Sequence, residues 1–131
     1  MKMKTVDIGR IGEDAATRFL KKSKLKIIER NIHISHKEID IIAISKKQKL
    51  ILFVEVKART VDKDLYSPFG TPASAVTREK QQRTVTAARG YMHSNPKYFD
   101  YQPRFDVIEI YLDKEDHTIL KTNHIENAFG V

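Results

Sequence analysis

Three ionisable residues, Asp40, Glu55 and Lys57, lie in two short stretches whose other residues, apart from Glu38, are apolar. The first stretch reads Glu-Ile-Asp-Ile-Ile from residue 38, and the second reads Phe-Val-Glu-Val-Lys from residue 53. A charged group in a buried strand lowers stability unless it is paired or bound to a metal ion. An aspartate followed further along the chain by Glu-x-Lys suits a divalent-metal site that hydrolyses phosphodiester bonds.

The residue types agree with that chemistry. Magnesium prefers hard oxygen ligands, usually one or two carboxylates together with waters and a substrate phosphate. Asp40 and Glu55 would supply the carboxylates, and the carbonyl of Val56 a further oxygen. Lys57 would orient a water beside the metal or assist its deprotonation, because lysine pKa values respond to burial and to neighbours. We therefore predict Mg²⁺ or Mn²⁺ as the cofactor.

Strands are predicted to hold these residues. Apolar runs and alternation predict strands at residues 27–34, 38–44, 50–58 and 104–112, with a last edge strand at 118–124. A polar turn at residues 45–49 predicts a hairpin, in which Asp40 and Glu55 can converge. Because side chains alternate along a strand, Glu55 and Lys57 share one face, and Asp40 shares a face with Ile42. The alternative is a cross-strand salt bridge among Glu38, Asp40 and Lys57.

Two helices complete the predicted fold. Helical spacing of apolar residues predicts a helix over residues 10–22, with Glu13 at the margin of the apolar stripe and able to face the core. Thr77 can cap a second helix that runs to about residue 93, after a long connection over residues 60–73. The order of elements predicts one domain over residues 1–131, an α/β/α sandwich with a central mixed sheet.

Composition narrows the function classes. Lysine and arginine number 24 against 17 acidic residues, which gives a net charge of +7 and favours a polyanionic partner such as nucleic acid. The absence of cysteine excludes disulfides, thiolate catalysis and cysteine-based zinc sites. No apolar run approaches the roughly 20 residues of a membrane span, and the start of the chain lacks a secretory signal. We expect a cytoplasmic protein.

An ordered set of short motifs resembles the YraN-like family of uncharacterised small bacterial proteins. The motifs are Gly-Arg-Ile-Gly-Glu at 9–13, Arg-Asn at 30–31, Glu-Ile-Asp-Ile-Ile-Ala at 38–43, Phe-Val-Glu-Val-Lys-Ala-Arg at 53–59, Pro72, Ala75-Val76 and Lys80. The resemblance covers about residues 8–110. It implies the restriction-endonuclease-like fold of the PD-(D/E)xK nuclease superfamily, with similarity to archaeal Holliday-junction resolvases.

The resemblance assigns roles to the residues that match the motifs. Asp40 matches the motif aspartate, and Glu55 with Lys57 matches the (D/E)xK pair. Glu13 matches the first-helix glutamate of resolvase-like members, which makes it a candidate for catalysis and for binding metal. Lys80 falls in the following helix, where such nucleases often place a further polar residue.

Basic residues near these motifs are candidates for binding a phosphate backbone. They are Arg10, Arg59, Arg78, Lys80 and Arg83. The predicted helix start near Thr77 could itself bind phosphate. A lysine run at residues 21–26 is typical of a solvated face, with phosphate contact as the alternative.

Together these observations predict a metal-dependent endonuclease that acts on DNA rather than RNA, on branched or flapped structures by analogy with resolvases. Resolvase-like cutting of two strands requires two active sites, so the resemblance implies a homodimer. The alternative is a nucleic-acid-binding or adaptor module that keeps the nuclease fold without catalysis. A third hypothesis is a purely structural partner protein.

Overall fold

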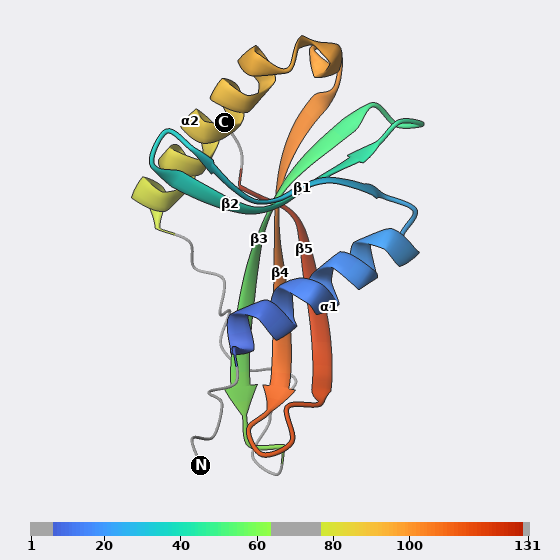
Figure 1. Ribbon diagram of the computed structural model, residues 1–131, viewed down its shortest axis with the longest axis vertical. Coiled ribbons are helices and arrows are strands. Elements are labelled where there is room, and N and C mark those ends of the chain that lie inside the picture. The colour runs from blue at the N-terminus through green and yellow to red at the C-terminus, as the bar shows by residue number, and fades with distance from the viewer. Residues whose placement is uncertain (1–6, 64–76, 130–131) are drawn as a thin grey trace, which may run out of the picture.

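The computed structural model describes residues 7–63 and 77–129. Figure 1 shows the elements in chain order: α1 (Ile8–Lys22), β1 (Lys26–Ile34), β2 (Lys37–Ser45), β3 (Leu50–Val61), α2 (Arg78–Ser94), the short 3₁₀ helix η1 (Pro96–Tyr98), β4 (Gln102–Asp113) and β5 (Ile119–Phe129). The predicted order of helices and strands is confirmed. Most of the connection predicted at residues 60–73 lies outside the described residues. No helix in the described ranges is long and apolar enough to cross a membrane.

One mixed sheet joins the strands in the order β1-β2-β3-β4-β5. The neighbouring pairs are antiparallel except β3 and β4, which run parallel. A parallel pair needs a long crossover, and α2 lies in the segment that connects these two strands. The fold is therefore an α/β sandwich built on a mixed sheet, as predicted.

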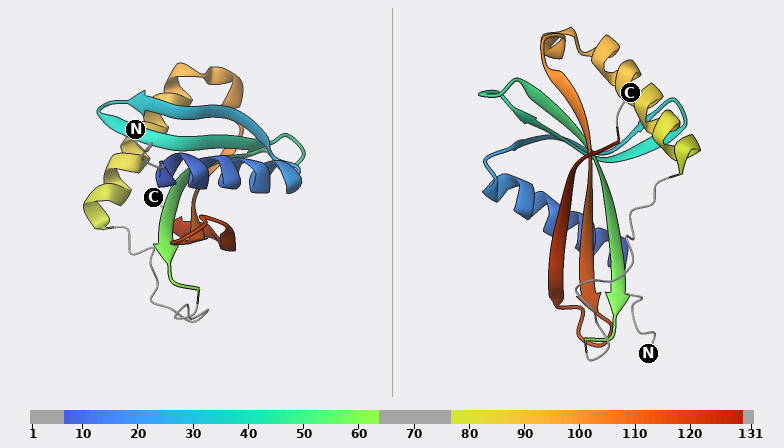
Figure 2. Two further views of the ribbon diagram at one scale, coloured as in Figure 1. Left: turned by 60° about the horizontal axis from the view of Figure 1, so that its bottom comes forward. Right: turned by 180° about the vertical axis from the view of Figure 1, so that it is seen from behind.

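The two helices cover opposite faces of the sheet (Figure 2). Ala16 and Leu20 of α1 pack against a cluster that includes Leu52 of β3. Ala87 of α2 packs against a second cluster that includes Phe53, the next residue of the same strand. Since successive side chains of a strand point to opposite faces, each helix covers its own core.

Gly12 allows α1 to lie directly on β3. A Cβ atom added at Gly12 would stand 2.5 Å from the Cβ of Ala58, which is too close for two non-bonded carbons. The helix is fixed at its start by Asp7, whose Oδ1 accepts a hydrogen bond of 3.0 Å from the backbone N–H of Arg10. This close approach brings the side chain of the next residue, Glu13, against the sheet, where it is buried.

The strands separate at the centre of the molecule. Between β2 and β3 the paired residues run from Ser45 with Leu50 to Ile41 with Val54. Beyond that point β3 continues to Val61 alongside β4, while β2 continues alongside β1. Figure 1 shows the β1–β2 hairpin diverging from the carboxyl-terminal halves of β3 and β4. Asp40 and Glu55 are the first residues beyond the last pair, so they lie where the strands part.

Candidate active site

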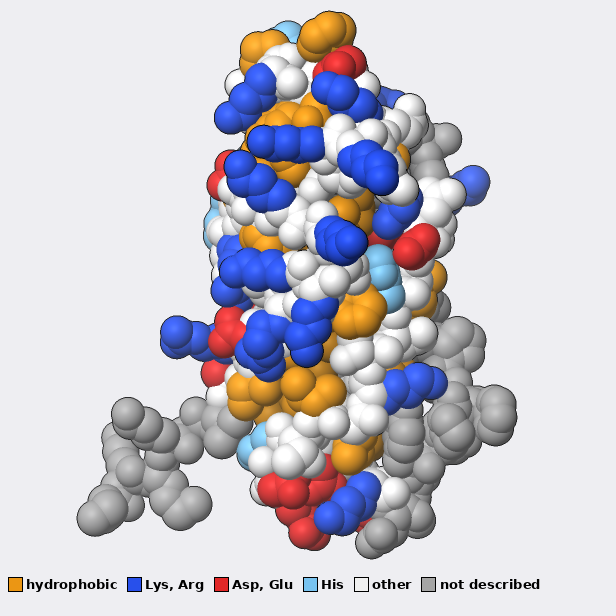
Figure 3. Space-filling model, turned by 90° about the vertical axis from the view of Figure 1, so that its right-hand side faces the viewer, with side chains coloured by type: hydrophobic (Ala, Val, Ile, Leu, Met, Phe, Trp, Pro, Cys, Tyr) orange, Lys and Arg blue, Asp and Glu red, His pale blue; other side chains and the backbone are white. Residues whose placement is uncertain are grey.

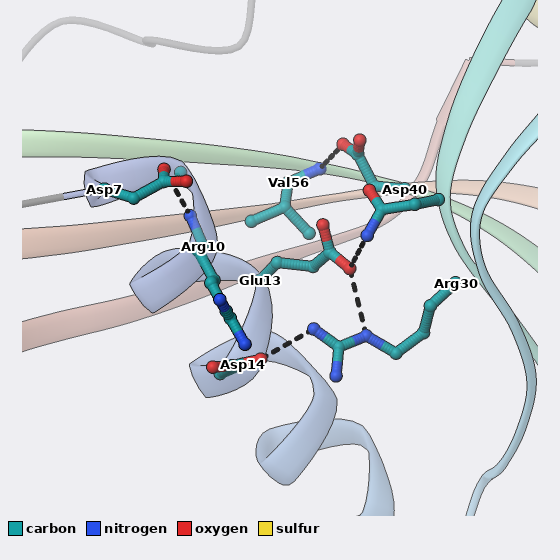
Figure 4. Close-up of a pocket in the computed structure, with 9 residues that line it drawn as sticks. Asp7, Arg10, Glu13, Asp14, Arg30, Asp40 and Val56 are labelled. Atoms are coloured by element: carbon teal, nitrogen blue, oxygen red, sulfur yellow. Dashed lines mark hydrogen bonds and ion pairs between the residues drawn. The ribbon is translucent and has the colours of Figure 1, made fainter.

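A polar cleft of about 650 Å³ opens between α1 and the region where β2 and β3 separate. Figure 4 shows the residues that line it: Asp7, Gly9, Arg10, Glu13, Asp14, Arg30, Asn31, Asp40 and Val56. Two of the sequence-predicted carboxylates, Glu13 and Asp40, therefore face the same space. They come from α1 and β2, which are separated in the chain by β1 and meet only in the folded structure.

Glu13 is held in place by two donors from β1. Its Oε1 accepts hydrogen bonds from Nε of Arg30 at 2.9 Å and from Nδ2 of Asn31 at 2.8 Å. Arg30 also donates from Nη2 to Oδ1 of Asp14 at 2.7 Å. The hydrogen bond with Asp14 raises the pKa of Arg30, and Glu13 adds to the rise against the opposing effect of burial. The cation and the amide together offset the cost of burying the Glu13 carboxylate.

Asp40 carries the most strongly perturbed carboxyl group of this region. Its Oδ2 accepts a hydrogen bond of 2.8 Å from the backbone N–H of Val56, which is freed where β2 and β3 separate. Burial raises the pKa of Asp40 from 3.8 to about 6; the Val56 hydrogen bond opposes the rise, and the negative charges of Glu55, Glu13 and Glu38 add to it. Ionisation of Asp40 is therefore less favourable here than in water, and a cation would relieve that cost.

Glu55 meets Asp40 on the other side of the sheet. Both residues line a small cavity of about 10 Å³, together with Thr84 of α2. That volume is at the lower limit for one water or one small ion. The Oε2 atom of Glu55 is buried and has no hydrogen-bond partner in the described part of the chain. An unsatisfied buried oxygen costs about 1–3 kcal/mol, which favours the binding of a water or a cation.

Asp40 thus lies between two spaces. Strict alternation predicted it on the face of Ile42 alone, but it lines both the cleft beside α1 and the cavity beside α2. The structure brings Glu13 and Asp40 together in one space, and Asp40 and Glu55 in the other. Within residues 7–63 and 77–129, no group of three or more histidine, aspartate or glutamate side chains is arranged so that it could hold a metal ion.

Lys57 lies two residues beyond Glu55 on β3 and is half-buried. Because both residues belong to the continuous strand β3, side-chain alternation assigns them to one face. The alternative prediction of a cross-strand salt bridge is wrong, because no ion pair joins Lys57 to Glu38 or Asp40. Instead Oε2 of Glu38 lies 3.7 Å from Nε2 of His33 on the neighbouring strand. Glu13 is paired with Arg30 at 2.9 Å, whereas Asp40, Glu55 and Lys57 form no ion pair with another described residue.

The predicted phosphate-binding residues divide between two sides. Arg10 lines the cleft, and Arg78, Lys80 and Arg83 are exposed on the first turns of α2. Lys80 precedes Thr84, which lines the small cavity, by one helical turn, so the two residues share one face of α2. Arg59 is exposed further along β3.

Thr77 caps α2 as predicted, because its side-chain oxygen accepts a hydrogen bond of 3.3 Å from the backbone N–H of Lys80. The helix start that could bind phosphate is therefore in place. It stands next to the exposed basic residues of the first turns of α2.

Sequence reasoning gave no role to Arg30 and Asn31, although both appear in the motifs. The one local signal is that asparagine tolerates positive φ, and Asn31 has φ of 50°. Asp106, on β4, pairs with Arg104 at 2.9 Å. His124 adds a contact of 2.7 Å and Asn127 a backbone N–H bond of 3.0 Å. This fully bonded aspartate has a structural role.

Comparison with known proteins assigns the chain to a family. A UPF0102 protein of Caldanaerobacter subterraneus subsp. tengcongensis is 46% identical over 122 residues, which are 93% of each chain. One of Clostridium perfringens is 41% identical over the full length of both chains, and one of Francisella tularensis subsp. novicida is 39% identical over 98% of this chain and 99% of its own. Residues 12–110 match the sequence model of the family described as Uncharacterised protein family UPF0102. The chain belongs to Uncharacterised protein family UPF0102.

Proposed function

We propose that this protein is a metal-dependent endonuclease that hydrolyses phosphodiester bonds in DNA, with the restriction-endonuclease-like fold of the PD-(D/E)xK superfamily. The observation that carries the proposal is the pair of carboxylates at the point where β2 and β3 separate. Among the described residues Oε2 of Glu55 is buried without a hydrogen-bond partner, and the pKa of the neighbouring Asp40 is raised to about 6. Both features indicate negative charge that lacks a counter-ion.

A divalent cation fits this donor set. Mg²⁺ and Mn²⁺ take hard oxygen ligands, and Asp40 and Glu55 present carboxylate oxygens to one small cavity. A bound cation would supply a water of lowered pKa and would stabilise the charge on a scissile phosphate. Glu13, which faces Asp40 across the cleft, is the candidate for a further ligand or for a hydrogen bond to that water.

The remaining residues would bind and orient the substrate. Lys57 would hold the attacking water in position from the face that it shares with Glu55. Arg10 in the cleft and Lys80 in the first turn of α2 would contact the phosphates on either side of the cut. Arg30 and Asn31 would keep Glu13 directed into the cleft through the two bonds to Oε1. Branched or flapped DNA and a homodimer, both implied by the resemblance to resolvases, belong to the same proposal.

One observation favours a second candidate function. Within the described residues the carboxylates are not already arranged as a set of three metal ligands. A module that binds nucleic acid without cutting it would need no such arrangement. Metal dependence separates the two functions, since only the nuclease requires a divalent cation.

The test is cleavage of labelled linear, single-stranded, flapped and four-way DNA in Mg²⁺, Mn²⁺ or EDTA. The wild type is compared with Glu55→Gln and with the matched control Glu115→Gln, which changes an exposed residue of the β4–β5 turn. Cutting that requires metal, is lost in Glu55→Gln and is kept in Glu115→Gln supports the nuclease. Salt-sensitive binding without cutting by any of the three proteins supports the binding module instead.

A further inference from the structure

A group of exposed lysines lies away from the candidate site. Lys21 and Lys22 end α1, and Lys24 and Lys26 lie in the turn that follows and at the start of β1. Lys46 and Lys47 occupy the turn between β2 and β3. We call these six residues the lysine face.

The sheet register brings the two segments together. Lys26 pairs with Ile44, the last residue but one of β2 before the β2–β3 turn. The start of β1 and that turn therefore lie at the same end of the strands. Figure 3 shows Lys and Arg side chains spread over most of this side of the molecule, while the Asp and Glu side chains gather mainly at its lower end.

The two segments that carry the lysine face contain no acidic residue. Residues 18–26 and 45–49 contain eight lysines and arginines and no aspartate or glutamate. Of these eight residues, Lys49 has an acidic partner outside the two segments, because its Nζ lies 3.4 Å from Oδ2 of Asp100. No ion pair joins any of the six lysines to another described residue. Clustered cations without counter-charges repel one another, and a polyanion would relieve that repulsion.

The distance to the cleft suits a single nucleic acid that contacts both regions. Lys22 follows Glu13 by nine residues of the same helix, which corresponds to about 13 Å along its axis. One strand of a duplex carries a phosphate about every 3.4 Å along its axis, so about four phosphates span that length. A duplex with one phosphate in the cleft can extend along α1 and reach the end of the helix within half a turn.

We propose that the lysine face binds the phosphate backbone of duplex DNA at a distance of about four base pairs from the phosphate held in the cleft. The class of the partner rests on the proposed function, whereas the contact surface is independent of it. The surface provides charge and no base-reading element, so it would bind without regard to sequence.

Nucleic acid fits this surface better than a membrane does. Binding at a membrane surface combines basic charge with inserted apolar side chains. The exposed large hydrophobic residues of the described chain are Phe99 and Ile119, and neither belongs to the segments that form the lysine face. The charges extend along the molecule instead, which matches a linear polyanion.

The experiment measures binding of a 24-base-pair duplex in EDTA, where no metal-dependent cutting can occur. The test variant carries Lys22→Gln, Lys24→Gln and Lys47→Gln. The control carries Lys63→Gln, Lys97→Gln and Lys114→Gln, three exposed lysines elsewhere, so both proteins lose the same charge. The slope of log K against log salt should fall by about 2.7 in the test variant, from about 0.9 per lost phosphate contact. The control should keep a slope close to that of the wild type.

Two results would overturn the inference. Equal losses in the test and control variants would mean that only net charge matters. Weak binding of DNA by the wild type, together with strong binding to vesicles of phosphatidylglycerol and phosphatidylcholine, would assign the face to a membrane. Cleavage is measured separately, so a chain that binds through the lysine face but never cuts would refute the nuclease and leave this inference standing.

Discussion

Replacing Asp40 by asparagine should stabilise the metal-free protein at neutral pH, although it removes a residue of the candidate site. Burial is the main reason why the pKa of Asp40 is raised from 3.8 to about 6, with Glu55 and Glu13 adding to the effect. A group whose pKa is higher in the folded state contributes stability below its unfolded pKa and loses it as the pH rises through the folded value. The rise from 3.8 to about 6, at about 1.4 kcal/mol per pKa unit, lowers the free energy of unfolding above pH 6 by at most about 3 kcal/mol. Asparagine keeps an acceptor for the Val56 N–H and carries no charge.

The assay is urea unfolding of the wild type and Asp40→Asn in EDTA at pH 8, 6 and 4. The variant should be more stable by about 1–3 kcal/mol at pH 8, and the difference should vanish toward pH 4. Asp106→Asn is a control of opposite sign. Burial alone would raise the pKa of Asp106, but hydrogen bonds from His124, Arg104 and Asn127 outweigh it and leave that pKa lowered, so this variant should lose stability at neutral pH. No stabilisation of Asp40→Asn at pH 8, or the same gain at pH 4, would refute the reasoning.

Two further predictions concern the packing that positions the site. Gly12→Ala should destabilise the protein by about 1–3 kcal/mol in urea unfolding, because its Cβ meets Ala58 at 2.5 Å, whereas Gly9→Ala, whose nearest contact is 3.4 Å, should change stability little. Arg30→Ala should cost about 1–3 kcal/mol, because it leaves the buried Glu13 carboxylate with one donor fewer. In a double-mutant cycle, adding Glu13→Gln to Arg30→Ala should recover part of the lost stability. Purely additive effects of the two substitutions would contradict the role of this pair.

Local patterns were enough to predict the helices and strands. Thr77 identified the start of α2, and the polar turn at residues 45–49 identified the β2–β3 hairpin, because capping and turn preferences act over a few residues. The last strand was predicted to end at residue 124, but β5 continues to Phe129. Its last residue, Phe129, pairs with Phe105 of β4, and this contact between residues 24 positions apart is not visible in a local pattern.

The environment of the candidate site was less predictable. Side-chain alternation described Glu55 correctly but not Asp40, because β2 leaves β3 at that residue and the freed Val56 N–H binds its carboxylate. β1 also contains a register shift between Ile27 and Glu29, which the residue types of this segment do not predict. The bonds of Arg30 to Glu13 depend on how α1 packs beside β1, and that follows from tertiary structure.

The most direct test of the central claim is calorimetric titration of the metal-free protein with Mn²⁺ and Mg²⁺, in two buffers of different ionisation enthalpy. We predict saturable binding that is lost in both Asp40→Asn and Glu55→Gln. At pH 6 binding should release about half a proton, because the pKa of Asp40 is about 6, and at pH 8 the release should disappear. Absence of saturable binding, or binding that persists in both variants, would contradict the assignment of Asp40 and Glu55 as a metal site.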